Sequence, residues 1–225
     1  MSTSYPSYES LLTADTSPHA SPDLLRLQWN LTSDNVSDCI SILDDPTNAD
    51  SKGEPYSSTH QICESASHCP PVSSIVVSIG NLNKYAREWI EAHGLHADPD
   101  DFDEDCEPPG FDDEGVVERC CGEDRPGEGP RLEIVAETGR FVTVGQFVSL
   151  VHPWLRELKG QLRGAASVWA GWGPEEDPKM IVRLYRMPIR IDDTRGWTPS
   201  WAVMERKMQA NMNENVIRTI EHLGL

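Results

Sequence analysis

The stretch RLEIVAETGRFVTVGQFVSLVHPWLRELKGQL (residues 131–162) carries the clearest structural pattern in the chain. Residues 131–137 alternate apolar with polar side chains, which predicts a strand, and 140–142 predict a second strand across a turn at Thr138–Gly139. Thr143 is a typical helix N-cap, and an apolar stripe follows it at helical spacing through Leu162. Pro153 lies inside this expected helix, where it cannot donate a backbone hydrogen bond. The order is therefore strand, strand, helix.

Similar patterns flank this stretch on both sides. Residues 25–31 alternate with period two and predict a strand, while 166–172 and 180–187 predict a hairpin. An apolar stripe from Trp201 to Leu223, after the cap Thr198, predicts a final helix. We therefore expect an α+β fold with a mainly antiparallel sheet covered by helices, a disordered N-terminus and a long acidic insertion.

Three segments resemble a domain family of unknown function that is common in fungal proteins. They are Leu27-Gln-Trp-Asn-Leu31, Leu132-Glu-Ile-Val135 and Val142-Thr-Val-Gly-Gln-Phe-Val148, with Asn30 at a position where the family pattern has Asp. The resemblance implies no activity. It does imply that the strand at 25–31 pairs with the C-terminal sheet, which makes 33–130 an insertion.

Composition divides the rest of the chain. Ser, Thr, Tyr and Pro dominate residues 1–22, which we expect to be a disordered tail. We expect an α+β domain from 23–32 plus 131–225, and a linker over 33–71. A strand at 75–79 and a helix near 81–93, with Asn81 as its cap, place a helix-containing insertion at 72–96. An acidic flexible loop over 97–130 completes the organisation.

Charge is distributed unevenly. The chain carries 37 acidic and 19 basic side chains, for a formal charge of −18. Residues 131–225 sum to +2, which leaves −20 for the first 130 residues. This balance repels nucleic-acid phosphate and anionic lipid, so we expect neither nucleic acid nor a membrane as a partner. No signal peptide and no long apolar run is present, which favours a cytoplasmic or nuclear protein.

Two clusters contain metal-ligand side chains. An EF-hand loop begun at Asp101 would place Cys106 at the glycine position and prolines at positions 8 and 9, so the calcium motif fails. Zn²⁺ accepts the side chains of His60, Cys63, His68 and Cys69, but their spacing lacks a tight Cys-x2-4-Cys pair. The adjacent Cys120 and Cys121 are poorly placed to direct both sulfurs at one tetrahedral ion. We predict thiols without metal, and no cofactor.

Catalytic motifs are missing from the sequence. It has no nucleophile elbow, no His-Glu-x-x-His and no phosphate-binding glycine loop. The candidates for acid–base chemistry are His152, Asp192 and Asp193, which would have to share a cleft. The competing interpretation is that His152 packs in the fold and the two aspartates form a turn. A small enzyme built on these side chains is the alternative to a non-catalytic function.

Aromatic and basic residues gather in the C-terminal part, and both types are enriched at protein interfaces. The candidate binding residues are Trp169, Trp172, Arg183, Tyr185, Arg186, Arg190 and Trp197. Tryptophans also fill cores, which is the competing interpretation. We predict a protein-interaction module whose partner is another protein, with the acidic stretch around 98–114 screening the arginines. Oligomeric state is not predictable from these patterns.

Overall fold

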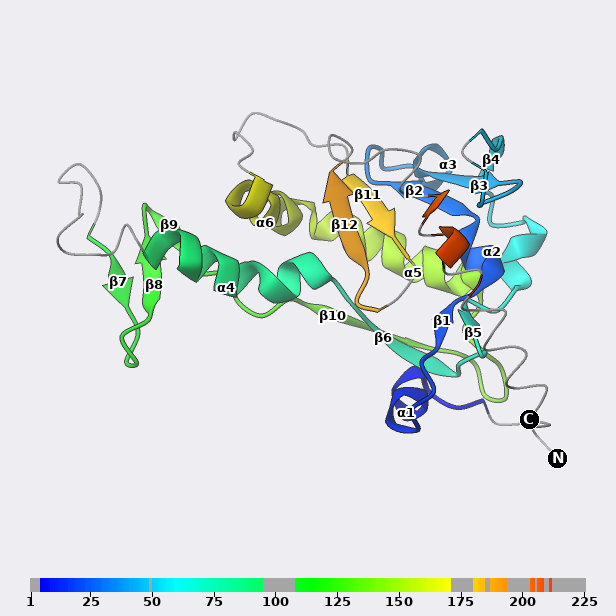
Figure 1. Cartoon of the computed structure of the whole chain (residues 1–225), viewed down its shortest axis with the longest axis horizontal. Helices are drawn as coiled ribbons and strands as arrows, with labels where there is room; N and C mark the ends of the chain where they lie inside the picture. Colours follow the sequence, from blue (N-terminus) through cyan, green and yellow to red (C-terminus); the bar gives the residue numbers. More distant parts are fainter. Residues whose placement is uncertain are drawn as a thin grey trace.

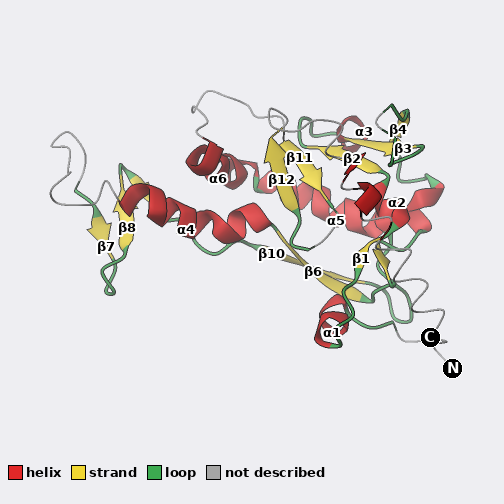
Figure 2. Cartoon of the chain, viewed as in Figure 1, coloured by secondary structure: helices red, strands yellow, loops and turns green. Residues whose placement is uncertain are grey.

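The computed structural model describes residues 5–48, 50–94, 108–170, 180–184 and 187–193, with residues 203–204, 206–208 and 211 near the C-terminus. Within these residues, helices lie against several small sheets whose paired strands are all antiparallel (Figures 1 and 2). The predicted α+β class is confirmed. The final helix falls mostly outside the described residues, although the described positions from 203 onward are helical.

The largest sheet has five strands and joins distant parts of the sequence. Its spatial order is β12 (Arg190–Asp193), β11 (Met180–Arg183), β2 (Leu27–Asn30), β3 (Ile40–Leu43) and β4 (Gly53–Pro55). β2 is central, and its Trp29 lies opposite both Val182 and Ile40. The early strand therefore pairs with a C-terminal strand, as the resemblance implied. Its central place follows from its alternating apolar side chains, which are buried in the core.

Helix α5 (Val144–Glu157) meets this sheet where its His152 stacks on Trp29 of β2, and its apolar stripe includes the fully buried Phe147. The predicted N-cap is confirmed, because the Thr143 hydroxyl accepts a hydrogen bond from the Gln146 N–H at 3.1 Å. Helix α6 (Lys159–Ala170) follows. The hairpin predicted from 166–172 and 180–187 is thus wrong: the first segment is helical up to Ala170, and β11 pairs instead with β12 and β2. Apolar runs of this length fit either structure.

A long two-stranded sheet lies beside the first. β10 (Arg131–Val135) pairs with β6 (Ser74–Ser78) over five residues, and helix α4 (Gly80–Gly94) follows β6 almost directly. The strand predicted at 131–137 is confirmed in position, but its partner is β6 rather than residues 140–142. Val142 instead donates its N–H to the carbonyl of Val72 at 2.8 Å. The segment predicted as a separate insertion is therefore integral to the fold.

The N-terminal segment differs from its prediction. Residues 5–22, expected to be disordered, hold helix α1 (Tyr8–Thr13), strand β1 (His19–Ala20) and the start of helix α2 (Pro22–Leu25). Serine N-caps begin both helices, and β1 pairs with β5 (His68–Cys69). Tyr8 and Ala20 are buried in the main core. Burial against distant segments offsets the cost of ordering a polar stretch.

Residues 33–71 also depart from the linker prediction. They contain helix α3 (Val36–Cys39), strands β3, β4 and β5, and the 3-10 helix η1 (Gln61–Glu64). Ile40, Ile42 and Ile62 are buried in the core. A few aliphatic residues at suitable positions are enough to place a mostly polar segment inside a domain.

The acidic region is ordered where the structure describes it. Strands β7 (Gly110–Phe111), β8 (Val117–Cys120) and β9 (Glu123–Asp124) form a small sheet near the C-terminal end of α4, at one end of the molecule (Figure 1). The Asp112 carboxylate accepts hydrogen bonds from the N–H groups of Glu114 and Val116 and pairs with Arg125 at 3.0 Å. Residues 108–130 are thus not a flexible loop. No described helix is long and apolar enough to cross a bilayer.

A substitution at Gly145 tests the close contact between α5 and η1. A Cβ at this position would lie 2.8 Å from the Cβ of Cys63 and 3.0 Å from its carbonyl oxygen. We expect Gly145→Ala to lower the free energy of unfolding by about 1–3 kcal/mol, because backbone atoms must move. Gly160→Ala is the matched control, since nothing lies within 4 Å there. Urea denaturation of both variants makes the measurement, and equal midpoints would contradict this packing.

Candidate functional site

The outer edge of β12 is joined to the start of α4. The Ile189 N–H donates to the Ser78 carbonyl at 2.9 Å, and the Gly80 N–H donates to the Ile189 carbonyl at 2.8 Å. These bonds form a parallel bridge between Ile79 and Ile189. The end of β6 therefore continues the five-stranded sheet for one step before the chain turns into α4.

The Asn81 side chain continues this ladder after the backbone has become helical. Its Nδ2 donates to the Ile191 carbonyl at 2.9 Å, while its Oδ1 accepts from the Ile191 N–H at 2.9 Å. An amide side chain offers the same donor and acceptor as a peptide group. Asn81 was predicted as the helix cap. It instead lies inside α4 and satisfies the sheet edge.

A pocket of about 430 Å³ opens at this junction. The lining residues come from α4 and from the segment that leads into β12: Gly80, Asn81, Lys84, Glu88, Met187, Pro188 and Arg190. Asn81, Lys84 and Glu88 are three and four positions apart, so they share one face of the helix. The pocket volume lies at the lower end of the range typical of ligand sites, about 300–1,000 Å³.

Two cationic side chains line this pocket, Lys84 from α4 and Arg190 from β12. Lys84 is exposed on α4, and the Arg190 side chain on β12 is 51% exposed. The nearby Asp192 carboxylate is 15% exposed, pairs with Arg183 and lies 3.9 Å from Arg190. Among the described residues of the lining, Glu88 is the one acidic residue. The polar wall thus offers two positive charges, one negative charge and a fixed amide.

Only part of the predicted aromatic and basic strip can be placed. Arg183 and Arg190 lie directly opposite each other on β11 and β12, and so share a face. Trp169 lies in α6 by its backbone. The other four candidates, Trp172, Tyr185, Arg186 and Trp197, lie outside the described residues. Arg190 is the predicted binding residue that lines the pocket.

Of the candidate acid–base residues, His152 and Asp192 lie outside the described pocket lining. His152 is buried in α5, where its ring stacks on Trp29 with centroids 5.9 Å apart. Burial lowers its pKa, although nearby Asp34 acts in the opposite direction. Asp192 is held in its ion pairs, and Asp193 ends β12. His152 and Asp192 do not line the pocket in the described structure, and the side chain of Asp193 lies outside what the structure describes.

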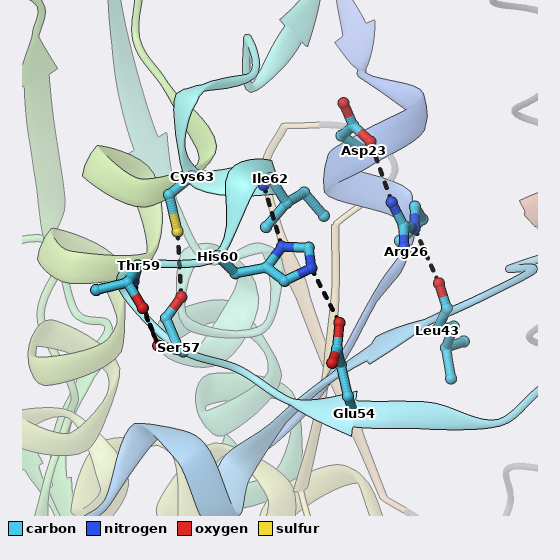
Figure 3. A network of polar contacts seen from close by, with 9 residues as sticks. All are labelled: Asp23, Arg26, Leu43, Glu54, Ser57, Thr59, His60, Ile62 and Cys63. Carbon is cyan, nitrogen blue, oxygen red and sulfur yellow. Dashed lines mark hydrogen bonds and ion pairs between the residues drawn. The ribbon is translucent and has the colours of Figure 1, made fainter.

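The candidate metal-ligand residues make local structural contacts. His60 caps η1, because its Nδ1 accepts the Ile62 N–H at 3.1 Å while its Nε2 contacts a Glu54 oxygen at 2.9 Å (Figure 3). The Cys63 thiol donates to Ser57 and Tyr56. Among the described residues, no group of three His, Cys, Asp or Glu side chains is arranged to hold a metal ion.

His68 and Cys69 lie on β5, whereas His60 directly precedes η1. The Ser67 hydroxyl donates to the Val142 carbonyl at 2.9 Å, so it accepts from His68 Nδ1 at 3.0 Å. This fixes the neutral tautomer with the proton on Nδ1. His68 Nε2 is buried and has no hydrogen-bond partner in the described structure. Burial, together with nearby His19, lowers the pKa of His68 to about 3.

Sequence reasoning missed most of the pocket. Lys84, Glu88, Met187 and Pro188 carry no motif, and their meeting depends on the Ile79–Ile189 bridge. The one available signal was Asn81, followed by Lys84 and Glu88 on the same helical face.

Comparisons with protein-family models, with curated proteins and with solved structures found no match to this chain. The site is therefore interpreted from its own geometry.

Replacing Asn81 tests the junction. Asn81→Ala removes the hydrogen-bond partners of the backbone N–H and carbonyl of Ile191. The part-buried donor and acceptor are then left unsatisfied. We expect a loss of about 1–3 kcal/mol in the free energy of unfolding. Asn83→Ala is the matched control on the same helix, because the exposed Asn83 makes only a 3.4 Å bond to Ser78. Similar denaturation midpoints for the two variants would contradict the role of Asn81.

The lowered pKa of His68 predicts that the free energy of unfolding depends on pH. Its folded pKa lies below that of the unfolded chain, so the unfolded state binds an extra proton between about pH 6.5 and pH 3. The free energy of unfolding should fall as pH falls through this range, by up to about 1.4 kcal/mol per pH unit from this group. The lowered pKa of His19 acts in the same direction.

His68→Gln removes the titrating group, and should reduce the slope of stability against pH by about one proton. Urea denaturation at a series of pH values measures the slope. An unchanged slope in the variant would rule out His68 as its source.

Proposed function

We propose that this chain is a non-catalytic protein-interaction module that receives an acidic peptide segment of a partner in the pocket between α4 and β12. The observation that supports this is the lining, in which Lys84 and Arg190 face one space beside Asn81. Guanidinium and ammonium groups recognise carboxylates by charge-assisted hydrogen bonds. Met187 and Pro188 add an apolar surface for the stem of a bound side chain.

The charges also indicate the class of partner. In a chain of formal charge −18, a pocket with two cations and one anion is locally positive. Its contribution to binding is short-range, because solvent and salt screen exposed charges beyond about 10 Å. A short acidic segment that enters the pocket gains this attraction without bringing a large negative surface close to the rest of the chain.

An enzyme on this fold has no specific observation in its favour. That hypothesis requires His152 and one of the two aspartates to share a cleft, whereas His152 and Asp192 are absent from the described lining of the pocket. His152 is buried against Trp29, and Asp192 is held by arginines. General acid–base catalysis requires a group within hydrogen-bond reach of a substrate.

The acidic stretch remains part of the proposal as a regulatory arm, in a narrower form. Its described portion from residue 108 onward belongs to the small sheet at the far end of α4, away from β12 (Figure 1). Residues 95–107, which hold a run of Asp and Glu, lie outside the described residues. We propose that this shorter segment competes with the partner for Lys84 and Arg190.

Charge reversal at the pocket tests the binding proposal. We expect Lys84→Glu to weaken binding of a fluorescein-labelled peptide of alternating Asp and Leu by about tenfold, equivalent to about 1.4 kcal/mol. Arg190→Gln should weaken it by a similar factor, whereas Glu88→Gln should strengthen it. Fluorescence anisotropy at constant ionic strength measures the dissociation constants.

Lys52→Glu is the matched control for net charge, because Lys52 is exposed beside β4, at the opposite edge of the five-stranded sheet. It should leave binding unchanged. Equal losses in Lys52→Glu and Lys84→Glu would show a general charge effect and refute the pocket. Preference for a matched basic peptide would refute the proposed class of partner.

A further inference from the structure

Adjacent cysteines occupy the hairpin turn between β8 and β9. Cys120 pairs with Glu123 across the ladder, so Cys121 and Gly122 form a two-residue connection. Their φ angles are +53° and +78°. Positive φ at both central positions is the signature of a type I′ turn, in which Asn-Gly is strongly preferred.

Cys121 is an unusual residue for this turn. A side chain other than Asn, Asp or Gly rarely adopts positive φ, and a residue held there is a reason to look for a function. Asn at the same position would favour the turn without a thiol. The chain therefore has a cysteine at a position whose positive φ is unfavourable for this residue type.

The turn brings the two sulfurs together. Sγ of Cys120 lies 3.6 Å from Sγ of Cys121. Cys120 is buried in a small second core with Trp89 and Val117, whereas Cys121 is exposed. Cys120 is thus held in a packed core with its sulfur 4.0 Å from the His93 carbonyl oxygen, whereas Cys121 is an exposed residue.

This spacing suits chelation better than a disulfide. Two thiolates bound at about 2.3 Å to one tetrahedral ion lie about 3.8 Å apart, close to the spacing seen here. A disulfide instead requires sulfurs about 2.0 Å apart and Cα atoms about 4.4–6.8 Å apart, but adjacent Cα atoms are about 3.8 Å apart. From the sequence, adjacent cysteines were expected to be poorly placed for sharing one tetrahedral ion, whereas the 3.6 Å between these two sulfurs is compatible with sharing.

We propose that Cys120 and Cys121 form a dithiol site for a soft, thiophilic metalloid or metal ion that accepts two thiolates at a bent angle. Soft thiolate ligands select ions of this class. The site is independent of the pocket at α4 and β12, because it shares no residue with the pocket lining.

Phenylarsine oxide is a suitable probe. Two arsenic–sulfur bonds form, the arsenic–oxygen bond breaks, and the oxygen leaves as water with the two thiol protons. Arsenic remains trivalent, so no oxidant or reductant is required. A dithiol chelate also resists excess glutathione, because a monothiol lacks the advantage of holding both sulfurs on one molecule.

The experiment is intact mass spectrometry of the reduced full chain after treatment with phenylarsine oxide and then excess glutathione. We expect one retained phenylarsenic group per chain, with one water released. Cys121→Asn should lose this adduct while its melting temperature stays unchanged or rises, because Asn suits the turn. Cys120→Ala should also lose it.

Two matched controls remove other thiols. Cys69→Ser, at a half-buried position on β5, and Cys106→Ser should both retain the adduct. A retained adduct in Cys121→Asn, or its loss in Cys106→Ser, would refute the two-sulfur site. A Cys120–Cys121 disulfide that forms in air, in a chain that takes up no arsenical when reduced, would likewise refute chelation.

Discussion

The junction between Ile189, Ile191 and the start of α4 joins the five-stranded sheet to the two-stranded sheet of β6 and β10. Backbone bonds from Ser78 and Gly80 fix Ile189, and the Asn81 amide then fixes Ile191. A sheet edge presents unpaired donors and acceptors that must be satisfied or covered. Here the residue that satisfies them is also the first polar residue of α4. The pocket lies beside this edge because the helix leaves the strand at this point.

Burial explains why the polar first half of the chain is folded. Tyr8, Ile40 and Ile62 all belong to the same core as Trp29 and Phe147. Each comes from a segment with too few apolar residues to fold alone, but each buries its side chain against elements formed elsewhere. Local composition therefore underestimates order wherever a short segment is a strand or cap in a larger sheet.

The two proposed sites depend on backbone geometry that has little sequence signal. Lys84 and Arg190 are far apart in sequence and become neighbours through one parallel bridge. Cys120 and Cys121 are adjacent, yet their sulfurs converge because the turn takes positive φ values. In each case the side chains are visible in the sequence, whereas their relation is set by hydrogen bonding between strands.

The sequence alone determined the α+β class, the helices α4 and α5, the Thr143 cap and the strands at 27–30 and 131–135, because these follow from local periodicity and capping. The pairing of the early strand with the C-terminal sheet was implied only by the resemblance to a domain family. Only the tertiary structure decided the partner of β10, the helical state of α6 and the order in residues 5–71. Strand partners and burial depend on contacts between residues that are distant in sequence, and a local sequence pattern carries no information about those contacts.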